Sequence, residues 1–169
     1  MISVLPFSVR AKYARRSPTG AQARGPGWRR TSCGFYVPSD VDGDVVEQRI
    51  LEAGAVLPSY GGVTGWAALR WMGAHWFTGV GPGGVELPVC LATGATVIRK
   101  QPGIKPSTER LDPRDLTSHD GLRLTSAVRS VCFEMRYAPS ERRAVVDLDM
   151  AAYADLVSLA ELGEFADRH

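Results

Sequence analysis

Residues 120–137 read DGLRLTSAVRSVCFEMRY, and the secondary structure predicted for the chain changes within this stretch. Asp120-Gly121 is a turn signal, and the run from Leu122 to Thr125 is typical of a short strand. Ser126 is a favoured N-cap residue for a helix over residues 127–137. The stretch therefore predicts a strand followed directly by a helix.

The same pattern extends outward on both sides and predicts an α+β fold with C-terminal helices. On the C-terminal side, helices are expected over 127–137, over 141–153 with Val145, Leu148 and Ala152 on one face, and after the capping box Ser158–Glu161, where Val157 and Leu162 form a hydrophobic staple. On the N-terminal side, short mixed or antiparallel strands are expected at 33–37, 87–92, 96–100 and 104–111. Two helices are expected there, one at 45–51 with the capping pair Asp44 and Glu47 and one at 64–72 begun by Thr64.

The sequence shows no readable catalytic, cofactor or metal site. Residues 79–84 match GxGxxG, but Pro82 and the extended sequence that follows favour a loop over a dinucleotide site. His75 is interpreted as a packed or capping residue and His119 as a turn residue, and neither has a metal partner at helical or hairpin spacing. Asp147 and Asp149 are two apart on a helix, so they point to different faces. We therefore expect a protein without enzymatic activity, cofactor or metal.

The composition indicates the cellular compartment and argues against a membrane span. Three cysteines among 169 residues are too few for a disulfide framework, which favours a reducing cytoplasm. No apolar run approaches the roughly 18–20 residues that a membrane span needs. Trp66, Trp71 and Trp76 are spaced by five, which does not form one helical stripe, so core packing is favoured over a partner-binding surface.

Positive charge is concentrated at the N-terminus. Residues 1–39 hold seven of the 20 basic side chains and none of the 18 acidic ones. One interpretation is a disordered or loosely docked arm, or a start codon assigned too early. The other is a basic arm that contacts DNA phosphates, and the arginines that would make those contacts are Arg15, Arg16, Arg24, Arg29 and Arg30.

Seven segments form an ordered series along the chain, at 29–38, 47–53, 63–69, 73–74, 120–129, 145–149 and 156–162. This series resembles a large actinobacterial family related to the AbiE-type antitoxin of type IV toxin–antitoxin systems, and the resemblance covers about 140 of the 169 residues. It implies a divergent winged-helix-like DNA-binding part over 31–84, preceded by the basic arm over 1–30. An α/β antitoxin-like part would then occupy 85–169.

Two departures from that family matter for function. Relatives have an Asp four residues after the arginine that matches Arg129, whereas this chain has Phe133 there, followed by Glu134. Many relatives continue into an endonuclease-like domain similar to very-short-patch repair enzymes, whereas this sequence stops at His169 and contains no Glu-x-Lys. The first departure brings an ion pair between Arg129 and a residue of its own helix into question. The second departure agrees with the absence of a nuclease domain.

The first hypothesis is a cytoplasmic, non-catalytic, antitoxin-like protein that binds DNA and that regulates its own transcription, neutralises a cognate toxin, or does both. The second is the recognition half of a truncated or split endonuclease-family protein that acts with a separate catalytic chain. The third is a degenerate remnant without affinity for DNA. The gene downstream discriminates the first two, since a nucleotidyltransferase-like toxin favours the antitoxin and a frame with an aspartate and Glu-x-Lys favours the nuclease.

Overall fold

The predicted strand and helix around Ser126 are both present in the computed structural model of the chain, which describes residues 7–8 and 18–168. Strand β8 (Leu122–Thr125) pairs antiparallel with β7 (Leu116–His119) across a tight turn. Asp120 and Gly121 both have positive φ, at 48° and 78°, as a type I′ turn requires. Helix α3 (Ala127–Tyr137) follows, and the Ser126 hydroxyl accepts a hydrogen bond from the Arg129 amide at 3.3 Å.

Five strands form a mixed sheet in the order β6-β5-β4-β8-β7. Strand β4 (Gly62–Thr64) lies at its centre, antiparallel to β5 (Val89–Ala92) and parallel to β8, and β6 (Ile104–Ser107) runs parallel to β5. A Cβ atom on Gly62 would lie 2.6 Å from the backbone carbon of Leu124. The close approach of β4 to β8 therefore requires glycine at this position.

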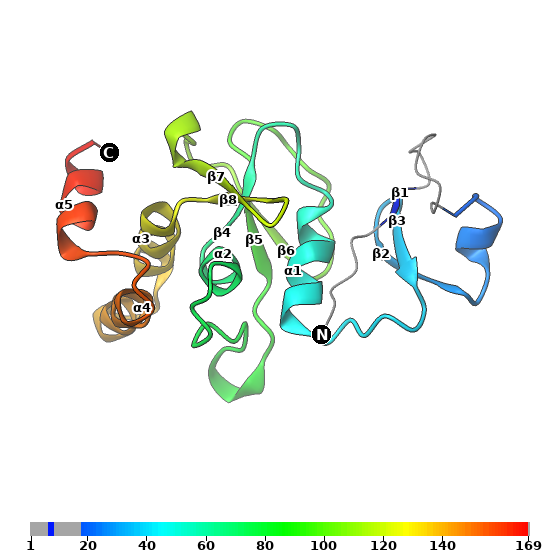
Figure 1. Ribbon diagram of the computed structural model, residues 1–169, viewed down its shortest axis with the longest axis horizontal. Helices are drawn as coiled ribbons and strands as arrows, with labels where there is room; N and C mark the ends of the chain where they lie inside the picture. The colour runs from blue at the N-terminus through cyan, green and yellow to red at the C-terminus, as the bar shows by residue number, and fades with distance from the viewer. Residues whose placement is uncertain (1–6, 9–17, 169) are drawn as a thin grey trace.

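Helices flank this sheet along the long axis of the molecule (Figure 1). Helix α1 (Val46–Gly54) packs against the central strands, and α2 (Trp66–Trp71) lies between β4 and α3. Helix α4 (Glu141–Tyr153) packs on α3, and α5 (Leu159–Arg168) lies at the outer end. The largest fully buried apolar side chains of the core are Ile50, Val63, Leu69, Val89, Leu91, Leu124 and Val131.

A second, smaller antiparallel sheet lies at the opposite end from α5 (Figure 1). It consists of the hairpin β2 (Trp28–Ser32) and β3 (Phe35–Pro38), with the two-residue strand β1 (Phe7–Ser8) on the other side of β3. A short 3-10 turn, η1 (Gln22–Arg24), packs against β2, and Ala23 within it is buried. Two further 3-10 turns, η2 (Pro82–Gly84) and η3 (Pro113–Asp115), lie in the loops of the larger unit.

The predicted α+β class, the short strands and the C-terminal helices are confirmed, but a winged helix in residues 31–84 is not shown. That range contributes β3 to the small sheet and α1, β4 and α2 to the larger unit. Strand β4 pairs with β5 and β8, so the two parts expected to meet at residues 84 and 85 share one sheet. The described portion of residues 1–30 contains β1, η1 and the beginning of β2.

Several local predictions differ from the structure. Residues 96–100 form no strand, and a strand at 116–119 was not predicted. Neither α1 nor α2 receives a hydrogen bond from an N-cap side chain, and Thr64 lies in β4, where its hydroxyl contacts that of Thr125 at 2.8 Å. The Asp44 amide instead donates to the Asp42 carboxylate.

Of two detailed predictions for the C-terminal helices, one is correct and one is wrong. The Ser158 capping box is confirmed, with the Glu161 amide donating to the Ser158 hydroxyl at 3.2 Å and the Ser158 amide donating to Glu161 at 2.8 Å. The predicted inward face of α4 is wrong, because Asp147 and Ala151 are buried whereas Val145 is 54% exposed. Apolar residues lie on several sides of this helix, so packing against α3 selects the buried side.

Candidate nucleic-acid interface

Of the five arginines predicted to contact DNA, two are exposed on the small sheet and its flanking turn. Arg24 ends η1, and Arg30 lies on β2, where its Nε donates to the Ser32 carbonyl at 3.1 Å. Arg15 and Arg16 lie outside the described residues. Arg24 and Arg30 therefore carry the described part of the predicted site.

Arg29 has a different position, because its guanidinium is held by helix α1. Its two terminal nitrogens donate to the two carboxylate oxygens of Glu52 at 2.7 and 3.1 Å, and Nη2 also lies 3.2 Å from the Val41 carbonyl. The hydrogen bonding of Arg29 to Glu52 outweighs partial burial and raises the pKa of Arg29. Arg29 thus fastens the hairpin to α1, and a phosphate would compete with Glu52 for the same nitrogens.

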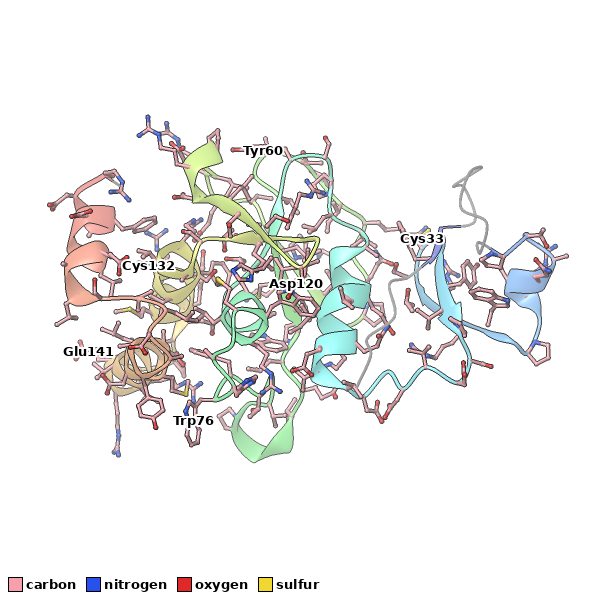
Figure 2. The ribbon with its side chains drawn as sticks, viewed as in Figure 1. Cys33, Tyr60, Trp76, Asp120, Cys132 and Glu141 are labelled. Atoms are coloured by element: carbon pink, nitrogen blue, oxygen red, sulfur yellow. The ribbon has the colours of Figure 1, made fainter. Side chains whose placement is uncertain are left out.

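The structure adds two basic residues that the sequence did not indicate. The segment after β5 returns to the turn of the β2–β3 hairpin, where the Cys33 amide donates to the Gln101 side chain at 2.7 Å. One Arg99 nitrogen lies 4.0 Å from the Cys33 sulfur. Arg99 and its neighbour Lys100 are both exposed, so they extend the positive charge of the hairpin, whose turn residue Cys33 is labelled in Figure 2.

We call these four exposed residues (Arg24, Arg30, Arg99 and Lys100) the hairpin basic group. Within residues 18–168, none of the four forms an ion pair with a carboxylate. By contrast, the cations of Arg29, Arg49, Arg70 and Arg129 are each paired with an acidic side chain. The hairpin basic group is therefore available to an external anion.

A second polar region is a half-open cavity of about 830 Å³ between η3, the first turns of α3, and α5. Its buried centre is Arg129, which contacts Glu109 at 2.6 Å and lies 3.9 Å from Asp115. Tyr137 and Arg136 also bind Glu109, at 2.7 and 3.3 Å. Burial raises the pKa of Glu109, but these hydrogen bonds and positive charges outweigh it and lower that pKa overall.

This network shows how Arg129 is paired although residue 133 is a phenylalanine rather than the aspartate of the family. Phe133 carries no charge and packs against Tyr137, with ring centroids 4.8 Å apart and the ring planes tilted by 56°. Arg129 finds its acidic partners on the segment before α3 rather than within its own helix. The lining holds five arginines and five carboxylates, a balance that favours an internal structural network over an anion site.

Burial raises the pKa of three ionisable groups in the larger unit. Glu134 accepts a hydrogen bond from the Trp66 amide at the start of α2, at 2.8 Å, and burial raises the pKa of its carboxyl. Burial also raises the pKa of the Cys90 thiol to about 12, so this sulfur is protonated at neutral pH. Cys132 is half-buried and its pKa is likewise raised by burial.

The remaining candidate residues match their predictions in part. His119 is exposed, as expected, but it is the last residue of β7 rather than a turn residue, and the His75 side chain is exposed rather than packed. Residues 79–84 form a loop in which Gly79 lies against the Trp66 ring, and an extended segment follows it. Asp147 is buried and Asp149 exposed, on different sides of α4. Among the described residues, no group of three His, Cys, Asp or Glu side chains is placed to hold a metal.

The three evenly spaced tryptophans occupy three different environments. Trp66 is buried and its indole donates to the Pro88 carbonyl, Trp71 is partly buried, and Trp76 is 63% exposed. Core packing is confirmed for Trp66 and is wrong for Trp76.

No protein-family model, curated protein or solved structure matches this chain. None of the described helices is long and apolar enough to cross a membrane.

Proposed function

We propose that this protein binds DNA without cleaving it and acts as an antitoxin-like regulator. The observation that carries the proposal is the hairpin basic group, in which the segment after β5 brings Arg99 and Gln101 into contact with Cys33 at the hairpin turn, with the exposed Lys100 between them in the chain. Four exposed cations without acidic partners in the described part of the chain form the kind of surface that phosphates neutralise.

The proposal takes the β2–β3 hairpin as the wing of a divergent winged-helix part. Arg15 and Arg16 precede it in a segment whose first 39 residues carry no acidic side chain, and they add to the same charge. Arg29 is left out of the contacting set, because its nitrogens bind Glu52. Specificity for a base sequence is not part of the proposal, since phosphate contacts carry none.

The antitoxin-like role comes from the family resemblance of the sequence. It implies a cytoplasmic protein that binds the DNA upstream of its own gene and pairs with a toxin encoded beside it. A protein partner would then occupy a surface other than the hairpin.

Fluorescence anisotropy with random duplex DNA and with the gene's own upstream DNA, across a salt series, tests the proposal. Each neutralised phosphate contributes about −0.9 to the slope of log affinity against log salt, so four or five contacts give a slope near −4. Preference for the upstream DNA would support autoregulation. The absence of binding at low salt would overturn the proposal.

A matched pair of variants separates the hairpin from general charge. The triple variant Arg30→Ala/Arg99→Ala/Lys100→Ala removes three charges of the hairpin basic group, and its salt slope should fall by about 2–3. The control Arg110→Ala/Arg114→Ala/Arg168→Ala removes three exposed charges from the cavity end of the molecule and should keep the wild-type slope. Equal slopes for both variants would refute contact through the hairpin.

The same reactions with Mg²⁺ and the neighbouring gene product distinguish the split nuclease. DNA cleavage that requires both chains would favour the recognition half of an endonuclease over the antitoxin. Neutralisation of a co-expressed toxin would favour the antitoxin.

A further inference from the structure

The outward face of α4 exposes three large apolar side chains to solvent. Opposite the buried side chains of Asp147 and Ala151, the helix exposes Val145 to 54%, Val146 to 39% and Tyr153 to 78%. At 3.6 residues per turn, Arg142 and Asp149 lie nearest the centre line of this outward face, with Val145 on one side of them and Val146 and Tyr153 on the other. The outward face therefore carries exposed apolar side chains on both sides of two charged ones.

The apolar face continues beyond the end of α4. Trp76, in the loop after α2, is 63% exposed and makes an edge-on contact with Tyr153, with ring centroids 6.3 Å apart. Figure 2 labels Glu141, where α4 begins, and Trp76. Two large, exposed aromatic rings beside two exposed valines are the composition of an interface centre rather than of an ordinary surface.

The charges on this face are arranged symmetrically about the two valines. Arg142 precedes Val145 by three residues, and Asp149 follows Val146 by three. Arg142 and Asp149 are about 10.5 Å apart along the helix axis, too far to pair with each other. Within residues 18–168 neither forms an ion pair.

We propose that two copies of this chain associate through α4, packed antiparallel about a two-fold axis that passes between Val145 and Val146. This axis places Arg142 of each copy against Asp149 of the other, and it brings the valines of both copies together. An isologous interface needs one patch that is complementary to itself, and this face meets that condition in both charge and apolarity.

The proposed dimer is compatible with DNA binding, and it does not depend on the proposed function. Helix α4 and the β2–β3 hairpin lie at opposite ends of the molecule (Figure 1), so dimerisation leaves both hairpin basic groups exposed. One helix and two aromatic rings make a small interface, which predicts a dimer that dissociates at micromolar concentration.

Sedimentation velocity over a concentration series tests the proposal with three charge variants. Arg142→Asp places carboxylates against carboxylates, and Asp149→Arg places guanidiniums against guanidiniums. Each single variant should dimerise about tenfold or more weakly than the wild type. The double variant Arg142→Asp/Asp149→Arg restores both pairs and should dimerise like the wild type.

Mixing gives the most specific result. The two single variants carry opposite charges on this face, so an equimolar mixture should form a heterodimer although each variant alone is weakened. Arg114→Asp, an exposed charge reversal on η3, is the control and should leave dimerisation unchanged. Far-UV circular dichroism confirms that each variant is folded.

Three results would overturn the proposal. The wild type could remain monomeric throughout the series, which would leave the face to a different partner. The single variants could dimerise as well as the wild type does. Finally, the wild type could dimerise while neither the mixture nor the double variant recovers association, which would place the interface elsewhere.

Discussion

The ion pair between Arg29 and Glu52 gives the sharpest test of how the hairpin is attached. The pair is bidentate, with donor–acceptor distances of 2.7 and 3.1 Å, and Gln48 also donates to Glu52 at 3.1 Å. Replacing Arg29 by alanine removes both hydrogen bonds and leaves the Glu52 carboxylate with Gln48 alone. The variant should therefore loosen the contact between the small sheet and α1.

The expected magnitude follows from the exposure of the two side chains. Glu52 is only 13% exposed, whereas Arg29 is 35% exposed, so water screens the pair in part. Exposed pairs contribute about 0.2–1 kcal/mol, and hydrogen bonds to charged groups about 1.5–3 kcal/mol. We therefore expect a coupling free energy of about 1–2 kcal/mol. Arg29→Ala alone should cost about 2 kcal/mol and lower Tm by roughly 4–8 °C.

Urea unfolding of the wild type, Arg29→Ala, Glu52→Ala and the double variant measures that coupling directly. The salt slope for DNA should be unchanged by Arg29→Ala, provided that the variant is folded, because the proposal gives Arg29 no phosphate. A coupling below about 0.3 kcal/mol would refute the structural role. A slope reduced by about 0.9 would instead assign Arg29 to DNA, as the sequence predicted.

Three further predictions concern the core. Gly65→Ala should cost more than about 1 kcal/mol in thermal unfolding, because φ is +64° and the new methyl group would collide with the Glu134 carboxylate. Burial raises the pKa of Glu134, so the folded protein keeps a proton that the unfolded chain has released. The free energy of unfolding should then fall as the pH rises from 4.5 through the raised pKa, and Glu134→Gln should remove this part of the pH dependence. If the variant has the same pH dependence of stability as the wild type, this prediction is wrong. An Ellman titration should find Cys33 reactive in the native protein and Cys90 reactive only after unfolding, and rapid reaction of native Cys90 would contradict the raised pKa of its thiol.

Local sequence signals predicted local structure well. The turn at 120–121, the strand that follows, the Ser126 cap and the Ser158 capping box each depend on residues within four positions of one another, and each is present. Strand β7 was missed because only Leu116 in it is apolar, so it carries no alternating pattern.

The candidate site depended on contacts that no local signal encodes. Arg99 and Cys33 are 66 positions apart in the sequence. Nothing in the residues around Arg99 and Lys100 indicates that this segment contacts the β2–β3 hairpin. Nothing in the sequence indicated that Arg29 and Arg30 should be treated differently. Neighbouring residues on a strand point to opposite faces of the sheet, but only the structure shows which face α1 covers. Glu52, which faces one and not the other, lies 23 positions further along the chain.

The central position of β4 also constrains the order in which the chain can fold. Thr64 contacts Thr125, 61 positions later, and closing a loop of that length costs roughly 3–4 kcal/mol of chain entropy before the contact forms. During synthesis, the larger sheet cannot close until residue 125 has left the ribosome. The β2–β3 hairpin needs only neighbours within 11 residues (Trp28–Pro38). The segment with Arg30 can therefore begin to pair while the sheet beneath α1 is still incomplete, and its contacts with Glu52 and Gln101 then fix it as the later parts of the chain fold.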